Sequence, residues 1–422
     1  AHGGGNSNGC PSTSALTNEN YVYTIAPQTE VTSIPTNTNT SNYIKNVTYF
    51  DGLGRAKQSI AIRQSASQRD IVTHIEYNGL GQQEKEYLPY VPTTTGDGVI
   101  KSAAANATTS YYSTHYGDAN AYSQKTIEKS PLGRVLEQGA PGTDWKIGTS
   151  FSSKGYSNNS HTIKFEYATN HGTEVRNYGV TTVYTSNNYY NPTLVDNGNY
   201  AANTLTKTIT KDENWVSGLD HTTEEFKNKQ GQVVLKRTYN ANAPHDTFYV
   251  YDDYGNLSYV IPPKAEGQGG IPTSTELTEL CYQYKYDYRN RLVEKKIPGK
   301  GWEYIVYDKL DRPVMTQDVN QRNHKDANNN LLRQWIITKY DKLGRVAFTG
   351  IHTNNSYVSR TSMQSQFDSQ NNTASKYFVT RAAGNVDYND TYYDNNNFPN
   401  TNTTVLSVNY YDDYNFDLAG VG

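Results

Sequence analysis

The sequence is poor in the residues that build thick apolar cores and disulfide frameworks. Its 422 residues include only 2 Cys and 2 Met, and hydrophobic residues make up 35% of the chain. Two cysteines in a chain of this length are too few for a disulfide framework, and the sequence leaves open whether Cys10 and Cys281 pair. The composition therefore argues against a thick apolar core.

Strong charge and long apolar runs are also missing. The formal net charge is -3, and no block of like charge stands out, so the chain has no basic field that would attract nucleic acid. No apolar run approaches the roughly 20 residues that span a bilayer. The chain begins without a charged-then-apolar leader, so we expect the processed form if the protein is exported. The sequence thus predicts neither a nucleic-acid partner nor a transmembrane segment.

Motifs for catalysis are absent as well. No Gly-x-Ser-x-Gly elbow and no His-Glu-x-x-His motif occurs, and the 9 His are scattered. His74 alternates with Ile75 on an expected strand, which favours a packed or surface histidine over a general base. We therefore predict no catalytic residue, no cofactor site and no metal site.

Two segments carry oxygen ligands that calcium could use. The run from Asp318 to Asn328 lacks the Gly and the closing Glu of an EF-hand loop, so a solvated loop is favoured. The run from Asp394 to Asn397 is interpreted in the same way.

What the chain has in excess is tyrosine. It contains 38 Tyr, 10 Phe and 4 Trp, which is not typical of a disordered chain. Tyr together with Asn and Thr suits pleated strands whose two faces are both partly wet. The only hint of a helix is the short run Ala103 to Ala105.

A turn motif recurs along the chain: an aromatic residue, Asp or Asn, two variable residues, Gly, and then a polar or basic residue. It is degenerate at residues 130–134 and 228–232, and it is absent from about 93 to 121 and from 150 to 205. The residues that we assign to the motif are Asp51, Gly54, Arg55, Asn78, Gly81, Gly133, Arg134, Gly231, Asp252, Gly255, Asp287, Asn290, Asp308, Asp311, Asp341, Gly344 and Arg345.

Physical chemistry explains this spacing. The Asp or Asn accepts hydrogen bonds from backbone N–H groups ahead of it, and Gly three residues later adopts the left-handed conformation that closes a hairpin turn. Asn290 tolerates that conformation, whereas Asp311 is a poorer substitute. We therefore predict positive φ at Gly81 and Gly344. Alternate tyrosines from Tyr282 to Tyr288 indicate strands beside such a turn.

The repeated tyrosines allow two interpretations. Their rings could stack on sugars, or they could pack across neighbouring strands, where an aromatic pair contributes about 0.2–1 kcal/mol. Packing is favoured because the Tyr positions follow the turn register. Glycan binding remains an alternative.

These repeats resemble those of RHS/YD-repeat proteins, and the first third of the chain resembles the DUF6443 module of Bacteroidota RHS proteins. The segments that carry the resemblance are YFDGLGR at 49–55, DIVTHIEY at 70–77, EYLPY at 86–90 and SPLGRVLEQGAPG at 130–142. The resemblance covers roughly residues 20 to 355. It implies an antiparallel sheet that winds into a hollow spiral shell, which in related proteins encloses a C-terminal toxin or variable segment and is often exported by type IX secretion.

The resulting expectation is an all-β protein, an extended antiparallel sheet of YD-repeat hairpins. Its regions are a flexible tail at 1–20, a DUF6443-like module at 21–150, an irregular polar β/loop region at 151–220 and a hairpin array at 221–422. The sequence stops at Gly422 without an autocleavage motif or a toxin domain, so the toxin role is inferred for a longer parent.

We expect a secreted or cell-surface, non-catalytic shell segment whose partners are proteins: the rest of its own chain or a component of the secretion translocon. The alternating end from Val408 to Tyr414 could supply an unpaired sheet edge for such a partner. The alternative function is a surface adhesin or glycan-binding module.

Overall fold

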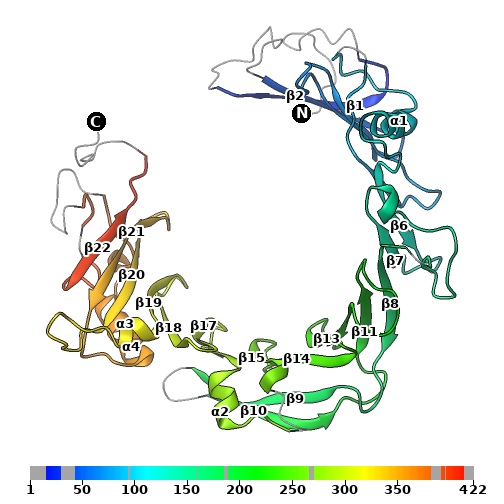
Figure 1. Cartoon of the computed structure of the whole chain (residues 1–422). Coiled ribbons are helices and arrows are strands. Elements are labelled where there is room, and N and C mark those ends of the chain that lie inside the picture. Colours follow the sequence, from blue (N-terminus) through cyan, green and yellow to red (C-terminus); the bar gives the residue numbers. More distant parts are fainter. Residues whose placement is uncertain are drawn as a thin grey trace. The chain divides into compact units, whose positions relative to one another are not determined.

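The structure of the chain is a computed structural model, shown in Figure 1. It describes residues 16–29, 43–93, 96–158, 160–184, 189–265, 270–381, 391–394 and 396–412. The chain divides into two compact units. The first comprises Ala1–Ala168, Thr208–Glu224 and Thr238–Ala243, and the second comprises Thr169–Lys207, Glu225–Arg237 and Pro244–Gly422.

Strands dominate both units and form three sheets among the described residues. The four-stranded sheet consists of β1 (Asn20–Pro27), β2 (Tyr43–Phe50), β3 (Ala56–Ala61) and β4 (Ile71–His74). The two-stranded sheet consists of β9 (Arg176–Tyr184) and β10 (Tyr190–Asn199). The 16-stranded sheet consists of β5 (Lys85–Tyr87), β6 (Tyr122–Ile127), β7 (Val135–Gly139), β8 (Ile163–Thr169), β11 (Thr206–Lys211), β12 (Thr222–Lys227), β13 (Val233–Asn240), β14 (Ala243–Tyr251), β15 (Leu257–Ile261), β16 (Tyr282–Tyr286), β17 (Leu292–Ile297), β18 (Gly301–Tyr307), β19 (Pro313–Gln317), β20 (Gln334–Tyr340), β21 (Val346–Thr353) and β22 (Thr403–Val408).

Strand order in the largest sheet follows chain order from β5 to β22, with β9 and β10 left out. Pairing is antiparallel in the stretches β5 to β8 and β14 to β22. The prediction of an all-β protein with an extended antiparallel sheet of hairpins is therefore confirmed, and two smaller sheets accompany it.

Helices are short and few among the described residues. They are α1 (Ala104–Tyr116), α2 (Ser274–Glu279), α3 (Val319–Arg322) and α4 (Arg360–Gln370), with 3-10 turns at Thr143–Trp145, Pro263–Ala265 and Ala374–Lys376. The helix hinted at by Ala103 to Ala105 exists, but it continues to Tyr116. Thr and Tyr are weak helix formers, so the length of α1 comes from packing on the first unit's core, which contacts its Ala107 and Tyr111.

Helix α4 was not predicted. Ser359 caps its start by accepting a hydrogen bond from Ser362 N at 3.1 Å, and Met363 and Phe367 bury one face of the helix. The spacing of these two apolar residues, one turn apart, was a signal available in the sequence.

The apolar core is divided into small clusters. In the first unit, Val47, Tyr49, Ile60 and Val72 are fully buried between the strands of the four-stranded sheet and α1. In the second unit, one cluster surrounds Phe226 and Leu235, and another surrounds Trp335. This agrees with the expectation from composition that no single thick core forms.

The turn residues adopt the predicted backbone conformation. φ is 78° at Gly81 and 80° at Gly344, which confirms that prediction. The hairpin pairing shifts by one residue beside the turn, for example between Lys339 and Tyr340 in the β20–β21 pair, as expected for a bulged hairpin. Positive φ also occurs at Gly54, Gly133, Gly231, Gly255, Asn290 and Asp311.

Gly344→Val tests whether the turn needs this conformation. A Cβ at Gly344 would meet no atom closer than Arg312 Nη1 at 4.0 Å, so any cost arises from backbone strain rather than from a clash. We expect a loss of about 1–2 kcal/mol in the free energy of unfolding, measured by denaturant titration. Leu343→Val, at a 74% exposed neighbour, should cost less, and Gly344→Asn should cost less because Asn290 holds the same position. Equal stability of Gly344→Val and the wild type would contradict this account.

Candidate functional site

The feature that recurs through the second unit is a hydrogen-bonded cluster at several of its hairpin tips. At the β16–β17 turn, Asp287 Oδ1 accepts hydrogen bonds from Arg289 N at 2.9 Å and Arg291 N at 3.0 Å. Its Oδ2 accepts one from Arg291 Nε at 2.8 Å. Asp287 is 3% exposed, so the carboxylate is buried but fully engaged. The same arrangement recurs at Asp51, Asp308 and Asp341.

The arginine of each cluster also contacts the next hairpin. The Arg291 guanidinium carbon lies 4.6 Å from the centre of the Tyr307 ring, and Tyr307 Oη donates to Leu292 O at 2.9 Å. The next hairpin repeats this arrangement. The Arg312 guanidinium carbon lies 4.5 Å from the centre of the Tyr340 ring, and Tyr340 Oη donates to Pro313 O at 2.8 Å. A Tyr–Asp–Arg linkage of this kind joins successive hairpins at Asp287 and Asp308 through a cation–π contact and a hydrogen bond.

Two further pairs extend the pattern. Arg345 lies over the Tyr411 ring at 4.2 Å in the second unit, and Arg55 lies over Tyr77 at 4.5 Å in the first. In the degenerate copy at residues 130–134 the carboxylate comes from outside the turn, because Arg134 Nε donates to Glu128 Oε1 at 2.8 Å.

Three copies of the turn were missed in the sequence. Residues 65–68, 152–155 and 326–329 close the same backbone turn, with positive φ at Gln68, Gly155 and Asn329. Ser takes the place of the acidic residue in two of them, and Asn329 replaces Gly in the third. The expectation that the motif is absent from 150 to 205 is therefore wrong, because Ser also accepts the hydrogen bonds that close the turn.

The segment considered as a calcium loop has another structure. Asp318 caps α3 by accepting from Gln321 N at 2.9 Å, and Asp326 Oδ1 accepts from Asn328 N and Asn330 N. The prediction of a solvated loop is thus corrected: the segment forms a capped helix and a turn, because both carboxylates accept hydrogen bonds from backbone N–H groups. Asp394 Oδ2 accepts from Thr380 N at 3.0 Å; its neighbour at 395 lies outside the described residues.

The other candidate groups are packed in the fold. His74 lies edge-on to the Tyr87 ring at 5.0 Å. Cys281 is buried and has no disulfide partner among the described residues, and burial raises the pKa of its thiol to about 11. Cys10 lies outside the described residues, so the question of its pairing with Cys281 is untested. In the described part of the chain, no group of three or more His, Cys, Asp or Glu side chains could hold a metal ion.

Electrostatics at the turns favour the ionised carboxylate. Backbone N–H donation from Arg55 is the largest of the contacts that hold the pKa of Asp51 below its ordinary value. At Asp341 burial raises the pKa, but hydrogen bonds from Arg345 outweigh it and the pKa is lowered. Burial raises the pKa of Tyr286 to about 12. Near neutral pH the Asp side chains are therefore charged and accept hydrogen bonds, whereas the Tyr286 hydroxyl is neutral and can donate one. This arrangement links neighbouring hairpins.

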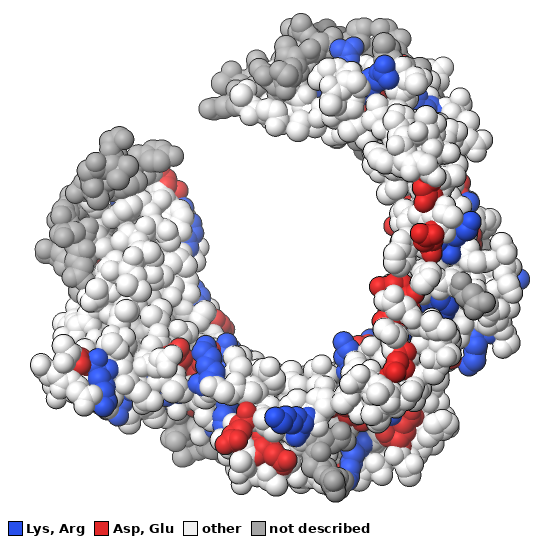
Figure 2. All heavy atoms as spheres, viewed as in Figure 1, with Lys and Arg blue, Asp and Glu red and all other residues white. Residues whose placement is uncertain are grey.

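Charged side chains of both signs lie in small mixed groups on the face shown in Figure 2. Where the chain is described, it has no helix both long and apolar enough to cross a membrane.

These features define a protein of repeated β-hairpins joined tip to tip. Residues 23–159 match the family model described as "Domain of unknown function (DUF6443)", so this part of the chain is a DUF6443 domain and the predicted resemblance is confirmed. The boundaries predicted at 150 and 220 stay predictions. No curated protein matches the sequence.

Two of the solved structures that resemble part of this chain are TcdB2-TccC3 and a Tc holotoxin pore. The crystal structure of TcdB2-TccC3 without its hypervariable C-terminal region has a TM-score of 0.41 at 15% identity, covering 74% of this chain and 13% of that one. The Tc holotoxin pore of Photorhabdus luminescens has a TM-score of 0.42 at 14% identity, covering 77% of this chain and 14% of that one. The chain therefore spans a small part of the length of these proteins.

Tyr307→Phe tests the linkage between hairpins. The change deletes the hydroxyl that donates to Leu292 O but keeps the ring beneath Arg291, so we expect a loss of about 0.5–1.5 kcal/mol in the free energy of unfolding. Tyr288→Phe is the matched control, because Tyr288 is 61% exposed at the preceding turn. Equal effects of the two changes in denaturant titrations would show that the hydroxyl is not a link.

Proposed function

We propose that this chain is a non-catalytic wall segment of a secreted or cell-surface RHS/YD-repeat protein. In this proposal the sheet winds into a spiral shell around a C-terminal toxin or variable segment of a longer chain, and the protein is exported by type IX secretion. The observation that carries the proposal is the Tyr–Asp–Arg linkage, which recurs at Asp51, Asp287, Asp308 and Asp341. The DUF6443 domain at residues 23–159 supports it.

The construction of the hairpins suits a wall. Strand order follows chain order, so each new hairpin widens the sheet without rearranging the earlier ones. Along β20, buried and half-buried side chains alternate, which gives a sheet that is dry on one face and partly wet on the other. The clusters at the tips supply the attachment that a thick core would otherwise provide. A wall of this kind can lengthen by repetition, as an enclosing shell requires.

A surface adhesin or glycan-binding module is the second candidate. Tyr254 and Tyr288 are 57% and 61% exposed at turn tips, where their rings could stack on sugars. The tyrosines of the linkage are less suited to this role, because their rings lie beneath arginines and their hydroxyls are bonded to carbonyls. Saturable binding on a glycan array, lost in Tyr254→Ala, would favour the adhesin.

The shell proposal predicts protection of a cargo. The chain should be expressed with the sequence that follows it in the parent protein, with an epitope tag on the C-terminal segment. We expect that segment to resist protease while the wall is folded and to be cut rapidly once mild denaturant unfolds the wall. A segment cut at the same rate in both states, and as fast as the isolated segment, would exclude enclosure.

The partner is proposed to be protein, added at the edge strand β22. Among the described residues, β22 pairs with β21 on one side only, and unpaired edge groups recruit another strand. Of the alternating end predicted from Val408 to Tyr414, residues 413 and 414 lie outside the described residues. The partner strand would come from the rest of the parent chain or from a secretion component.

Leu406→Lys tests this edge. Leu406 is 58% exposed on β22, and a lysine there should oppose strand addition. We expect the chain alone to associate in light scattering and the variant to associate less. Leu343→Lys, at an exposed turn tip, is the control and should behave as wild type. A monodisperse wild-type chain, or equal association of all three proteins, would contradict the edge proposal.

A further inference from the structure

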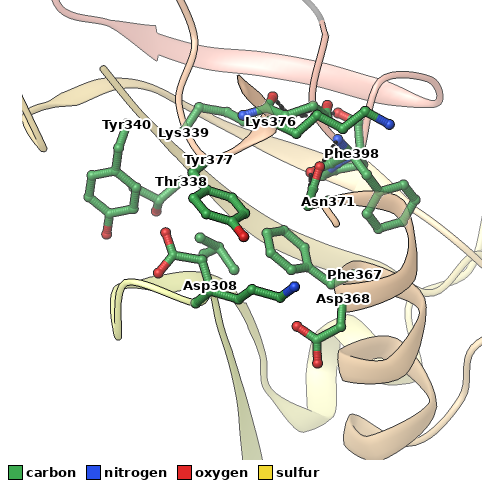
Figure 3. A pocket seen from close by; sticks show the side chains of 14 residues that line it. Asp308, Thr338, Lys339, Tyr340, Phe367, Asp368, Asn371, Lys376, Tyr377 and Phe398 are labelled. Atoms are coloured by element: carbon green, nitrogen blue, oxygen red, sulfur yellow. Dashed lines mark hydrogen bonds between the residues drawn. The ribbon is translucent and has the colours of Figure 1, made fainter. Parts of the chain in front are cut away.

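A buried lysine in the second unit lies against an asparagine side chain from a distant segment. Lys339, on β20, is 4% exposed. Its Nζ donates to Asn397 Oδ1 at 2.6 Å, to Asn397 O at 2.7 Å and to Pro399 O at 2.9 Å. Phe367 and Phe398 line the same pocket, as Figure 3 shows. The amine is therefore held against an amide carbonyl in a buried pocket that both apolar and charged side chains line, Asp308 and Asp368 among the latter.

Two influences on the amine oppose each other: burial lowers its pKa, whereas the three carbonyl acceptors match the three donors of an ammonium group. No described carboxylate lies within ion-pairing distance of Lys339 Nζ, and Asp394 acts on it only from farther away. Burial lowers the pKa of Lys339 to about 7, and the charge of Asp394 opposes that shift. Near and above pH 7 a fraction of the Lys339 amines therefore carries a free electron pair and donates only two of these hydrogen bonds, whereas an exposed lysine is almost wholly protonated.

The cavity beside this contact is small. Its volume is about 10 Å³, near the lower limit for holding one water molecule. Water that could compete with the amine for the Asn397 carbonyl is thus scarce. The fixed contact between amine and amide supplies the proximity on which a reaction within one molecule depends.

We propose that Lys339 and Asn397 form an intramolecular isopeptide bond. Lys339 Nζ attacks Asn397 Cγ, the Nζ–Cγ bond forms and the Cγ–Nδ2 bond breaks. One proton passes from Nζ to the departing Nδ2, which leaves as ammonia. Atoms and electrons balance without an oxidant, a reductant or a cofactor. The nearby Asp394 carboxylate favours the positively charged nitrogen that appears on the attacking amine, so it is a positioning residue.

The bond would join β20 to the segment before β22. Between these two points lie β21 and α4, so the closed loop would include the packing of α4 against the sheet. A cross-link stabilises chiefly by limiting the freedom of the unfolded chain. The bond would thus cross-link the last strands of the described hairpin array. The earlier hairpins are held together by their tip clusters.

Intact-mass spectrometry of the full chain tests the proposal. We expect the protein to be lighter than its sequence by one ammonia, and tryptic digestion to yield one branched peptide that joins the segments of Lys339 and Asn397. Lys339→Arg should abolish the mass deficit, because a guanidinium is not acylated by an amide. Lys376→Arg, in the same pocket, should retain the deficit. Asn397→Asp should still form the branched peptide, with loss of water in place of ammonia.

The outcomes separate a bond from a buried hydrogen-bonded ammonium. The proposal is overturned if the mass equals that of the sequence after prolonged incubation above the pKa of Lys339, or if the deficit maps to other residues. Circular dichroism of Lys339→Arg checks that the variant folds. Should it not fold, Asn397→Asp decides the question by its own branched peptide. Asp394→Asn should slow formation of the bond in a time course after refolding, without changing the product.

Discussion

The structure depends on the side-chain oxygen at the hairpin tips, which in the complete copies belongs to an Asp carboxylate. One side-chain oxygen accepts two backbone N–H groups and so shapes the turn, while the other holds the arginine that lies over the next tyrosine. Charged acceptors form stronger hydrogen bonds than neutral ones, and here the same charge serves the turn and the contact between hairpins. Local folding and neighbour-to-neighbour attachment are therefore coupled.

This coupling explains how a chain with a modest apolar content can form a large sheet. Burial is divided among separate clusters, and the tips add directional contacts at regular intervals. Each hairpin depends mainly on its neighbours, as in other repeat architectures. Some tips depart from the Asp, Gly and Arg of the complete motif and still form the turn. Asn290 adopts positive φ where other copies have Gly, and Glu128 supplies the carboxylate that pairs with Arg134.

The Lys339 pocket follows a different principle. A buried cationic group is costly unless it is paired or loses its charge, and three carbonyl oxygens surround this one. A desolvated amine held against an amide carbonyl is also a nucleophile in position, which is the basis of the covalent link proposed above.

The sequence by itself determined the turns, because their geometry depends on residues within one short segment: Asp or Asn sets the hydrogen bonds, and Gly or Asn accepts positive φ. The copies that begin at Ser65 and Ser152 were not predicted, because Ser forms the same turn hydrogen bonds but is not the Asp or Asn of the motif. Tertiary structure alone decided the length of α1, the position of α4 and the meeting of Lys339 with Asn397, which are 58 residues apart. Those outcomes depend on burial against distant strands, and no local pattern encodes which distant surface a segment will meet.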